Sequence, residues 1–128
     1  IEKLFSKIDG CDLVTGFRIE RQDKAHRRLN GILWTRLNKF IFGIPVRDVD
    51  CAFKLFRRKC LDGIELKSNQ LLIHAELIAR LKKKGCSIQE IGVPHYPRTA
   101  GQATATRPGR VLKTFCELAR LYRDISKK

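Results

Sequence analysis

The stretch Asp12-Leu-Val-Thr-Gly-Phe-Arg18 decides the fold. Its short apolar run with β-branched residues is typical of a buried β-strand, and a buried strand needs hydrogen-bonded neighbours. We expect some of these neighbours to be encoded upstream, because the chain contains no methionine and begins at Ile1 within a helical pattern. Residues 1–128 are therefore interpreted as a single partial domain, the back half of a longer protein.

Helical and extended patterns alternate along the rest of the chain. Apolar residues that recur every three or four positions predict helices over 1–8, 25–42, 69–84 and 108–125. Further strands are predicted over 51–56 and 87–93, with a short helix or turn over 57–62. The third helix is expected to begin at the N-cap Asn69 and to end at Gly85. This order predicts an α/β fold in which helices cover a small sheet.

Two of the predicted helices are expected to pack through apolar stripes. The stripe of the third helix consists of Leu71, Ala75, Ile78 and Leu81. The stripe of the last helix consists of Val111, Phe115, Leu118, Tyr122 and Ile125. Both stripes follow the spacing at which helical side chains share one face, so both helices are predicted to lie against the rest of the domain.

Composition limits the function classes. The hydrophobic content of 43% supports a packed core and excludes a disordered chain. The formal net charge of +14 attracts polyanions, namely nucleic acid, anionic lipid headgroups or phosphorylated substrates. No apolar run approaches the roughly 20 residues that cross a bilayer. The five cysteines form no Cys-x-x-Cys pair, so we predict reduced thiols in a cytosolic protein and no metal site in this chain.

A run of cations follows the deciding strand. Five of the eleven residues from 18 to 28 are cationic, namely Arg18, Arg21, Lys24, Arg27 and Arg28. These charges repel one another unless an anion or solvent relieves them. The run is either a clamp for phosphate groups or a solvated basic face, and the sequence leaves both readings open.

A second candidate segment precedes the predicted strand over 51–56. Arg47, Asp48 and Asp50 stand just before this strand, and Lys54 lies within it. The two carboxylates can bind a metal, act as a base, or orient Arg47 or Arg18. The alternative is an Asp that caps a turn and pairs with an arginine.

A third segment leaves the predicted strand over 87–93. It brings together His95, Tyr96 and Arg98, followed by small residues that include Gly101 and reach to Arg107. We interpret residues 95–107 as a mobile loop that contacts a ligand, although a lone histidine is more often structural. The sequence contains no Gly-rich phosphate loop, no Gly-x-Ser-x-Gly and no His-Glu-x-x-His motif.

These three segments, in this order, resemble the C-terminal half of inverting GT-A glycosyltransferases. The chain is similar to dolichol- or polyprenyl-phosphate mannosyltransferases and their bacterial relatives. The resemblance implies the acceptor-side half of a GT-A fold. The family pattern Asp-x-x-Ser-Gly-Phe-Lys appears here as Asp48-Val-Asp-Cys-Ala-Phe-Lys54, in which Cys51 and Ala52 replace serine and glycine.

The resemblance also implies roles for single residues. Arg18 corresponds to the arginine that closes the strand before the acceptor loop. Arg98 and Gly101 match the Arg-x-x-Gly of a late loop that folds over the donor phosphates, and Arg107 or Arg110 can supply the charge of a lysine missing after it. Guanidinium groups of this kind stabilise the charge that develops on a departing diphosphate.

The remaining candidates divide between anion binding and base catalysis. Arg47 and Lys54 are predicted to bind substrate phosphate together with Arg18. A phosphate acceptor is already an anion and needs little help from a base. A sugar hydroxyl acceptor needs one, and Asp48 or Asp50 is then the candidate catalytic base.

Cofactors and partners follow from the same resemblance. A nucleotide sugar is the expected donor, a polyprenyl phosphate the expected acceptor, and Mg²⁺ or Mn²⁺ the expected cofactor. Its ligands are expected upstream of Ile1, so the isolated chain is predicted to be inactive. Charge and the amphipathic helix over 25–42 fit a peripheral protein at the anionic, cytoplasmic face of a membrane. Exposed sheet edges are expected to favour homodimers or aggregates.

The alternative is a non-enzymatic basic module that binds nucleic acid. The charge supports this reading. Most of the ten aromatic residues fall on apolar helix stripes or strands, which leaves no evident stacking platform for bases and argues against nucleic acid as the partner.

Overall fold

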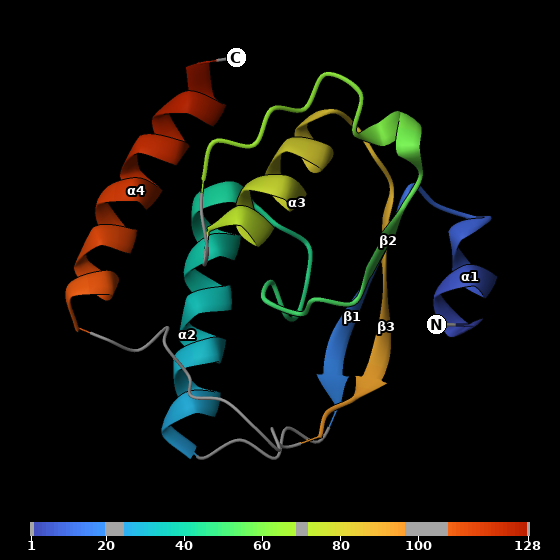
Figure 1. Cartoon of the computed structure of the whole chain (residues 1–128), viewed down its shortest axis with the longest axis horizontal. Coiled ribbons are helices and arrows are strands. Elements are labelled where there is room, and N and C mark those ends of the chain that lie inside the picture. Colours follow the sequence, from blue (N-terminus) through green and yellow to red (C-terminus); the bar gives the residue numbers. More distant parts are fainter. Residues whose placement is uncertain (1, 20–24, 69–71, 97–107, 128) are drawn as a thin grey trace.

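A computed structural model describes residues 2–19, 25–68, 72–96 and 108–127, the last range with side chains from residue 113 onward. The described chain is mixed α/β (Figure 1). Its helices are α1 (Glu2–Ile8), α2 (Ala25–Phe42), α3 (Ile73–Lys83) and α4 (Pro108–Lys127). Its strands are β1 (Leu13–Ile19), β2 (Lys54–Phe56) and β3 (Ile88–Pro94), with a 3₁₀ turn at Arg58–Cys60.

The three strands form one mixed sheet in the order β2-β1-β3. The deciding strand β1 lies in the centre of this sheet, between two strands that follow it in the chain. The expectation that β1 pairs with strands encoded upstream was therefore wrong for the described sheet, because β2 and β3 take its two sides. β1 runs antiparallel to β2, with Leu13 opposite Phe56, and parallel to β3, with Leu13 opposite Ile88. Successive side chains of β1 point to opposite faces, so each face of the sheet needs its own cover.

Helices cover the sheet on both faces (Figure 1). Val14 packs with Leu4 of α1 on one face. Leu13 packs with Ile78 and Leu81 of α3 on the other face. A further apolar cluster joins α2, α3 and α4 beyond α3, with Leu72, Leu118 and Leu121 at its centre. The α/β prediction is therefore confirmed for the described residues.

Local signals located most helix ends correctly. α2 has the predicted bounds, and its end at Gly43 uses a positive φ of 61° that glycine adopts without strain. Gly85 ends the α3 region in the same way, with φ at 83°. The predicted start of the third helix was wrong, because α3 begins at Ile73 with Leu72 as its cap residue. Asn69 lies outside the described residues.

The predicted strand over 51–56 is shorter than expected, because β2 contains only residues 54–56. A turn occupies the first part, where the Cys51 N–H donates to the Asp48 carbonyl at 3.4 Å. The turn passes directly over Gly16 of β1. A Cβ at Gly16 would lie 3.0 Å from Cys51 Sγ and 3.1 Å from Phe53 Cβ, so the missing side chain makes room for the turn.

The stripe predicted for the last helix is only partly buried. Leu118 is buried, and Ala75, Ile78 and Leu81 of α3 are buried as predicted. Phe115 and Tyr122 of α4, however, are each 50% exposed. α4 turns the face that carries Leu121 and Asp124 toward α3, where Arg80 binds Asp124 at 2.6 Å, and this orientation leaves the two aromatic rings at the margin.

Candidate functional site

The candidate site lies where β1 and β3 end. These parallel strands finish side by side, with Arg18 opposite Val93 and Ile19 opposite Pro94. The carboxyl ends of parallel strands are the usual position for ligand sites in α/β proteins. A pocket of about 220 Å³ opens beside this edge, lined by Phe17, Arg18, Arg28, Gly31, Ile32, Arg47 and Asp48. We call it the arginine pocket.

Arg18 and Asp48 form a two-pronged ion pair in this pocket. Arg18 Nε donates to Asp48 Oδ2 at 2.5 Å, and Nη2 donates to Oδ1 at 2.9 Å. Asp48 is only 6% exposed, so the carboxylate is held in a fixed position. The hydrogen bond to Asp48 raises the pKa of Arg18, which ensures that the guanidinium stays charged. Such paired, planar geometry orients an arginine more tightly than a single contact would.

Two further arginines reach the same pocket from different elements. The guanidinium carbon of Arg47 lies 4.9 Å from the centre of the Phe17 ring, in cation–π geometry. Its backbone N–H donates to Glu90 Oε1 at 2.6 Å, and its Nε lies 3.8 Å from Glu90 Oε2. Arg28 lines the pocket from α2, one helical turn before Ile32. The pocket lining therefore carries three guanidinium groups and one carboxylate, and Glu90 adds a second carboxylate next to Arg47. The excess of one positive charge favours an anionic occupant.

Asp50 lies behind the pocket and does not line it. Its Oδ1 accepts a hydrogen bond from Trp34 Nε1 at 3.2 Å. Burial raises the pKa of Asp50, and the negative charge of Asp48 adds to the effect. Of the two carboxylates predicted as candidate bases, Asp48 therefore orients Arg18, while Asp50 is the one whose proton affinity is raised.

Lys54 is turned toward the backbone of the preceding turn. Its Nζ donates to the Val49 carbonyl at 3.1 Å and also to the Cys51 carbonyl. Burial lowers the pKa of Lys54. The structure thus places this predicted phosphate ligand where it holds the turn that carries Asp48, and it is absent from the lining of the arginine pocket.

The predicted late loop is described only at its start. His95 is half-buried and Tyr96 is exposed, and both follow β3 at the edge where Arg18 lies. Arg98, Gly101 and Arg107 lie outside the described residues.

Sequence reasoning missed several residues of the pocket. Phe17, which lines the pocket, and Glu90, which lies outside the lining but contacts Arg47, were not singled out, because an aromatic residue and a carboxylate inside strands read as ordinary strand positions. Arg28 was counted in the cation run but not assigned to a site. Its spacing from Ile32 along one helix face was the signal that could have found it.

A separate cluster lies at the opposite end of β1. Single ligand atoms of Asp12, Cys60 and Cys86 all lie within 4.8 Å of one another. Asp12 Oδ2 already accepts hydrogen bonds from the backbone N–H of Ser87 at 3.0 Å and from its Oγ at 2.9 Å. Burial raises the pKa of Cys60 to about 11, so this thiol is protonated at neutral pH. Thiols are soft ligands, and the cluster therefore gives no support to Mg²⁺ or Mn²⁺.

Comparison with known proteins adds no assignment. No protein-family model matches the sequence, and no curated protein matches it either. Among the helices of the described ranges, none combines the length and the apolar character needed to span a membrane. Function is therefore argued from the arginine pocket and its surroundings.

Proposed function

We propose that the chain is the acceptor-side part of a nucleotide-sugar-dependent glycosyltransferase that transfers a sugar to a polyprenyl phosphate. The observation that carries the proposal is the arginine pocket, in which buried Asp48 fixes Arg18 beside Arg28 and Arg47. The mixed sheet with helices on both faces is compatible with half of a GT-A fold. The order of motifs along the sequence supplies the link to this particular chemistry.

The chemistry of the pocket suits a phosphate better than a neutral hydroxyl. Preorganised guanidinium groups stabilise phosphate oxygens and the charge that develops on them. A hydroxyl acceptor would need a base. Asp48 is a poor one, because its protonation would cost both charge-assisted hydrogen bonds from Arg18. Asp50 already accepts a hydrogen bond from Trp34 Nε1 and stands outside the pocket lining. An acceptor that is already an anion, such as a lipid phosphate, avoids this requirement.

A divalent cation belongs to the donor side of this proposal. In the described ranges, the single group of three metal-ligating side chains is the Asp12 cluster, whose two thiols do not fit Mg²⁺ or Mn²⁺. We therefore propose ligands for that cation outside the described residues, and we assign to the residues of the arginine pocket the binding and orientation of phosphate.

The test uses the full-length protein. Transfer of a radiolabelled sugar from a nucleotide sugar to polyprenyl phosphate in detergent is measured for wild type, Arg18→Ala and Arg28→Ala. We expect kcat/KM to fall about 100-fold for Arg18→Ala, the scale on which loss of one oriented charge-stabilising donor acts. Arg58→Ala is the matched control, because Arg58 is exposed on the 3₁₀ turn and outside the pocket lining. Wild-type rates in both pocket variants would refute the proposal.

One observation favours the rival reading of a nucleic-acid-binding module. Phe40, Phe115 and Tyr122 are at least half exposed on a basic protein, and exposed aromatic rings are groups on which bases can stack. If the rival is correct, the chain binds a single-stranded oligonucleotide with an affinity that falls steeply with salt. Phe40→Ala then weakens this binding, while Arg18→Ala changes it no more than Arg58→Ala does.

A further inference from the structure

Exposed apolar side chains gather on the outer side of two helices, α2 and α4. We call this surface the α2–α4 face. Its members are large apolar side chains with exposed fractions between 40% and 90%, namely Leu29, Ile32, Leu33 and Phe40 of α2 with Phe115 and Tyr122 of α4. Exposed apolar surface of this kind is rare on proteins without a partner and marks an interaction site.

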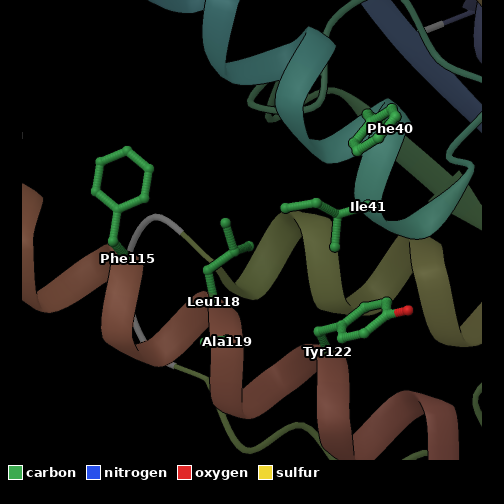
Figure 2. Close-up of a pocket in the computed structure, with 6 residues that line it drawn as sticks. All are labelled: Phe40, Ile41, Phe115, Leu118, Ala119 and Tyr122. Carbon is green, nitrogen blue, oxygen red and sulfur yellow. The ribbon is translucent and has the colours of Figure 1, made fainter.

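The α2–α4 face is hollowed where the two helices meet. A groove of about 410 Å³ is lined by Phe40, Ile41, Phe115, Leu118, Ala119 and Tyr122. Figure 2 shows these side chains projecting from α2 and α4 around the groove. The ring of Tyr122 also contacts the ring of Phe42, with a centroid distance of 6.5 Å and a tilt of 50° between the two planes. The lining offers little to hydrogen-bond, so its occupant is apolar.

The face connects the groove with the arginine pocket. Leu29, Leu33 and Phe40 are spaced by four and seven residues, so they lie along one side of α2. The rise of a helix places Leu29 about 16 Å from Phe40. Ile32 belongs to the exposed face and also lines the arginine pocket. Exposed apolar side chains therefore lie along α2 between the cationic arginine pocket and the apolar groove, with the exposed Arg36 among them.

Charge on this side of the molecule is almost entirely positive. α2 contains no acidic residue, and Arg28, Arg36 and Lys39 are exposed on it. α4 exposes Arg120 and Arg123. Its two carboxylates are already paired. Asp124 accepts from Arg80 Nη2 at 2.6 Å and from Lys67 Nζ at 3.2 Å, and Glu117 lies 3.9 Å from Lys113.

We infer that the α2–α4 face docks on an anionic lipid bilayer, with the apolar side chains in the acyl region and the flanking cations at the headgroups. Basic residues beside leucines and aromatic rings are the composition of helices that lie in the plane of a membrane interface. Nucleic acid fits less well, because Leu29, Ile32 and Leu33 contribute aliphatic surface that does not stack on bases. The inference deepens the proposed function, since it brings the arginine pocket to the level of lipid phosphates, and it rests on that function only for this consequence.

Vesicle binding tests the surface directly. The full chain is sedimented with phosphatidylcholine vesicles that contain or lack phosphatidylglycerol. The paired variant Leu33→Gln with Phe40→Gln is expected to lower partitioning onto the anionic vesicles at least tenfold. Both positions are at least half exposed, so the variant should keep the wild-type circular dichroism spectrum. Phe5→Gln is the matched control, because Phe5 is 57% exposed on α1, on the other side of the sheet.

Several results overturn the inference. The inference fails if the wild-type chain does not bind the anionic vesicles. It also fails if the Phe5→Gln control loses as much vesicle binding as the paired variant. A wild-type dimer in light scattering that the paired variant converts to a monomer would show a second copy on the face instead. An oligonucleotide at stoichiometric concentration could displace the bound vesicles. If the paired variant also failed to bind this oligonucleotide, the face would be assigned to nucleic acid.

The same variants separate this inference from the proposed function. In full-length protein, Arg18→Ala should lower kcat/KM for transfer about 100-fold but retain vesicle binding. The paired variant should lose transfer to long-chain polyprenyl phosphate in vesicles but keep transfer to a short-chain, water-soluble prenyl phosphate. If Arg18→Ala transfers normally while the paired variant loses vesicle binding, the membrane face stands and the transferase proposal fails.

Discussion

Two arginine–carboxylate clusters in this chain share their chemistry and differ in their surroundings. In the helical layer, Arg80 binds Glu76 at 2.7 Å and Asp124 at 2.6 Å. At the sheet edge, Arg18 binds Asp48 with two hydrogen bonds of 2.5 and 2.9 Å. Both clusters hold a buried carboxylate, since Glu76 is 0% and Asp48 6% exposed. Geometry of the pair alone does not tell which cluster binds a ligand.

The balance of charge around each pair makes the distinction. Lys67 and Arg80 offset Glu76 and Asp124, and Glu76 also accepts from the backbone N–H groups of Lys67 and Ser68. That cluster is complete within the protein. In the arginine pocket, Arg18 and Arg47 pair with Asp48 and Glu90, and Arg28 adds a further positive charge beside an opening to solvent. A cluster whose charges balance within the protein stabilises the fold, whereas an excess of positive charge favours the binding of an anion.

The largest effect is expected from breaking the complete cluster. Arg80→Ala leaves Glu76 buried without its cationic partner, and removal of one member of a buried pair costs about 3–5 kcal/mol of unfolding free energy. Urea unfolding monitored by circular dichroism measures this loss. Arg36→Ala, at an exposed position of α2, serves as the control and should change stability by less than about 0.5 kcal/mol. A small effect at Arg80 would mean that the cluster is solvated.

Substitution of an arginine in the arginine pocket should lower ligand affinity and leave stability almost unchanged. Arg28→Ala removes an exposed charge and should leave unfolding free energy within about 0.5 kcal/mol of wild type. Affinity for inorganic pyrophosphate should fall about tenfold, because a hydrogen bond to a charged group contributes about 1.5–3 kcal/mol. Isothermal titration calorimetry measures the affinity. Unchanged pyrophosphate binding, or a large loss of stability, would place Arg28 among the structural arginines.

Acid titration sharpens the same comparison through Glu76. Burial raises the pKa of this carboxyl, but hydrogen bonds from the Ser68 and Lys67 backbone and from Arg80 outweigh burial, so the pKa is lowered in the folded chain. The carboxylate therefore stabilises the fold above its unfolded pKa of about 4.5, and this stabilisation is lost as the pH falls through the lower folded value. Glu76→Gln should weaken the decline of stability in acid by about 1 kcal/mol or more. An unchanged slope of unfolding free energy against pH would contradict the assignment.

Substitution of Asp50 should have the smallest effect on stability, and its dependence on pH should be opposite to that of Glu76. Burial and the charge of Asp48 raise its folded pKa, so the folded state favours the protonated form. Stability linked to Asp50 is present below its unfolded pKa and is lost as the pH rises through the folded pKa. Asp50→Asn, which retains an oxygen for Trp34 Nε1, should raise the thermal midpoint at pH 7 and leave it unchanged at pH 3. A lower midpoint at pH 7 would show that the charge itself is needed.

The sequence predicts the features that depend on residues close together along the chain. The bounds of α2 and the stops at Gly43 and Gly85 follow from periodicity and from the backbone freedom of glycine. The Arg18–Asp48 pair was one of several readings left open, because its members lie 30 residues apart and only the packing of the turn over Gly16 brings them together. Nothing in spacing could join the members of the Asp12 cluster, which stand on separate elements.

Burial of helix faces was the least predictable feature. Phe115 and Leu118 are both apolar and lie on neighbouring parts of α4, yet the first is half exposed and the second buried. Leu118 packs with Leu72 and Leu121 in the apolar cluster between the helices, and Arg80 binds Asp124 between α3 and α4. Arg80 and Asp124 are 44 positions apart, and sequence periodicity carries no information about a contact of this kind.

The pairing of β1 with β3 affects the order in which the sheet forms during synthesis of the chain. β1 meets β2 within about 45 residues of chain, but β3 joins β1 only across the 75-residue span that the Asp12–Ser87 hydrogen bonds close. Closing the longer loop costs more entropy, and during synthesis its second end emerges later. We expect β1, β2 and the turn that carries Asp48 to assemble first and β3 to add last. Until β3 arrives, one edge of the central strand stays open, and this nascent stage is when the chain is most prone to pair with another copy.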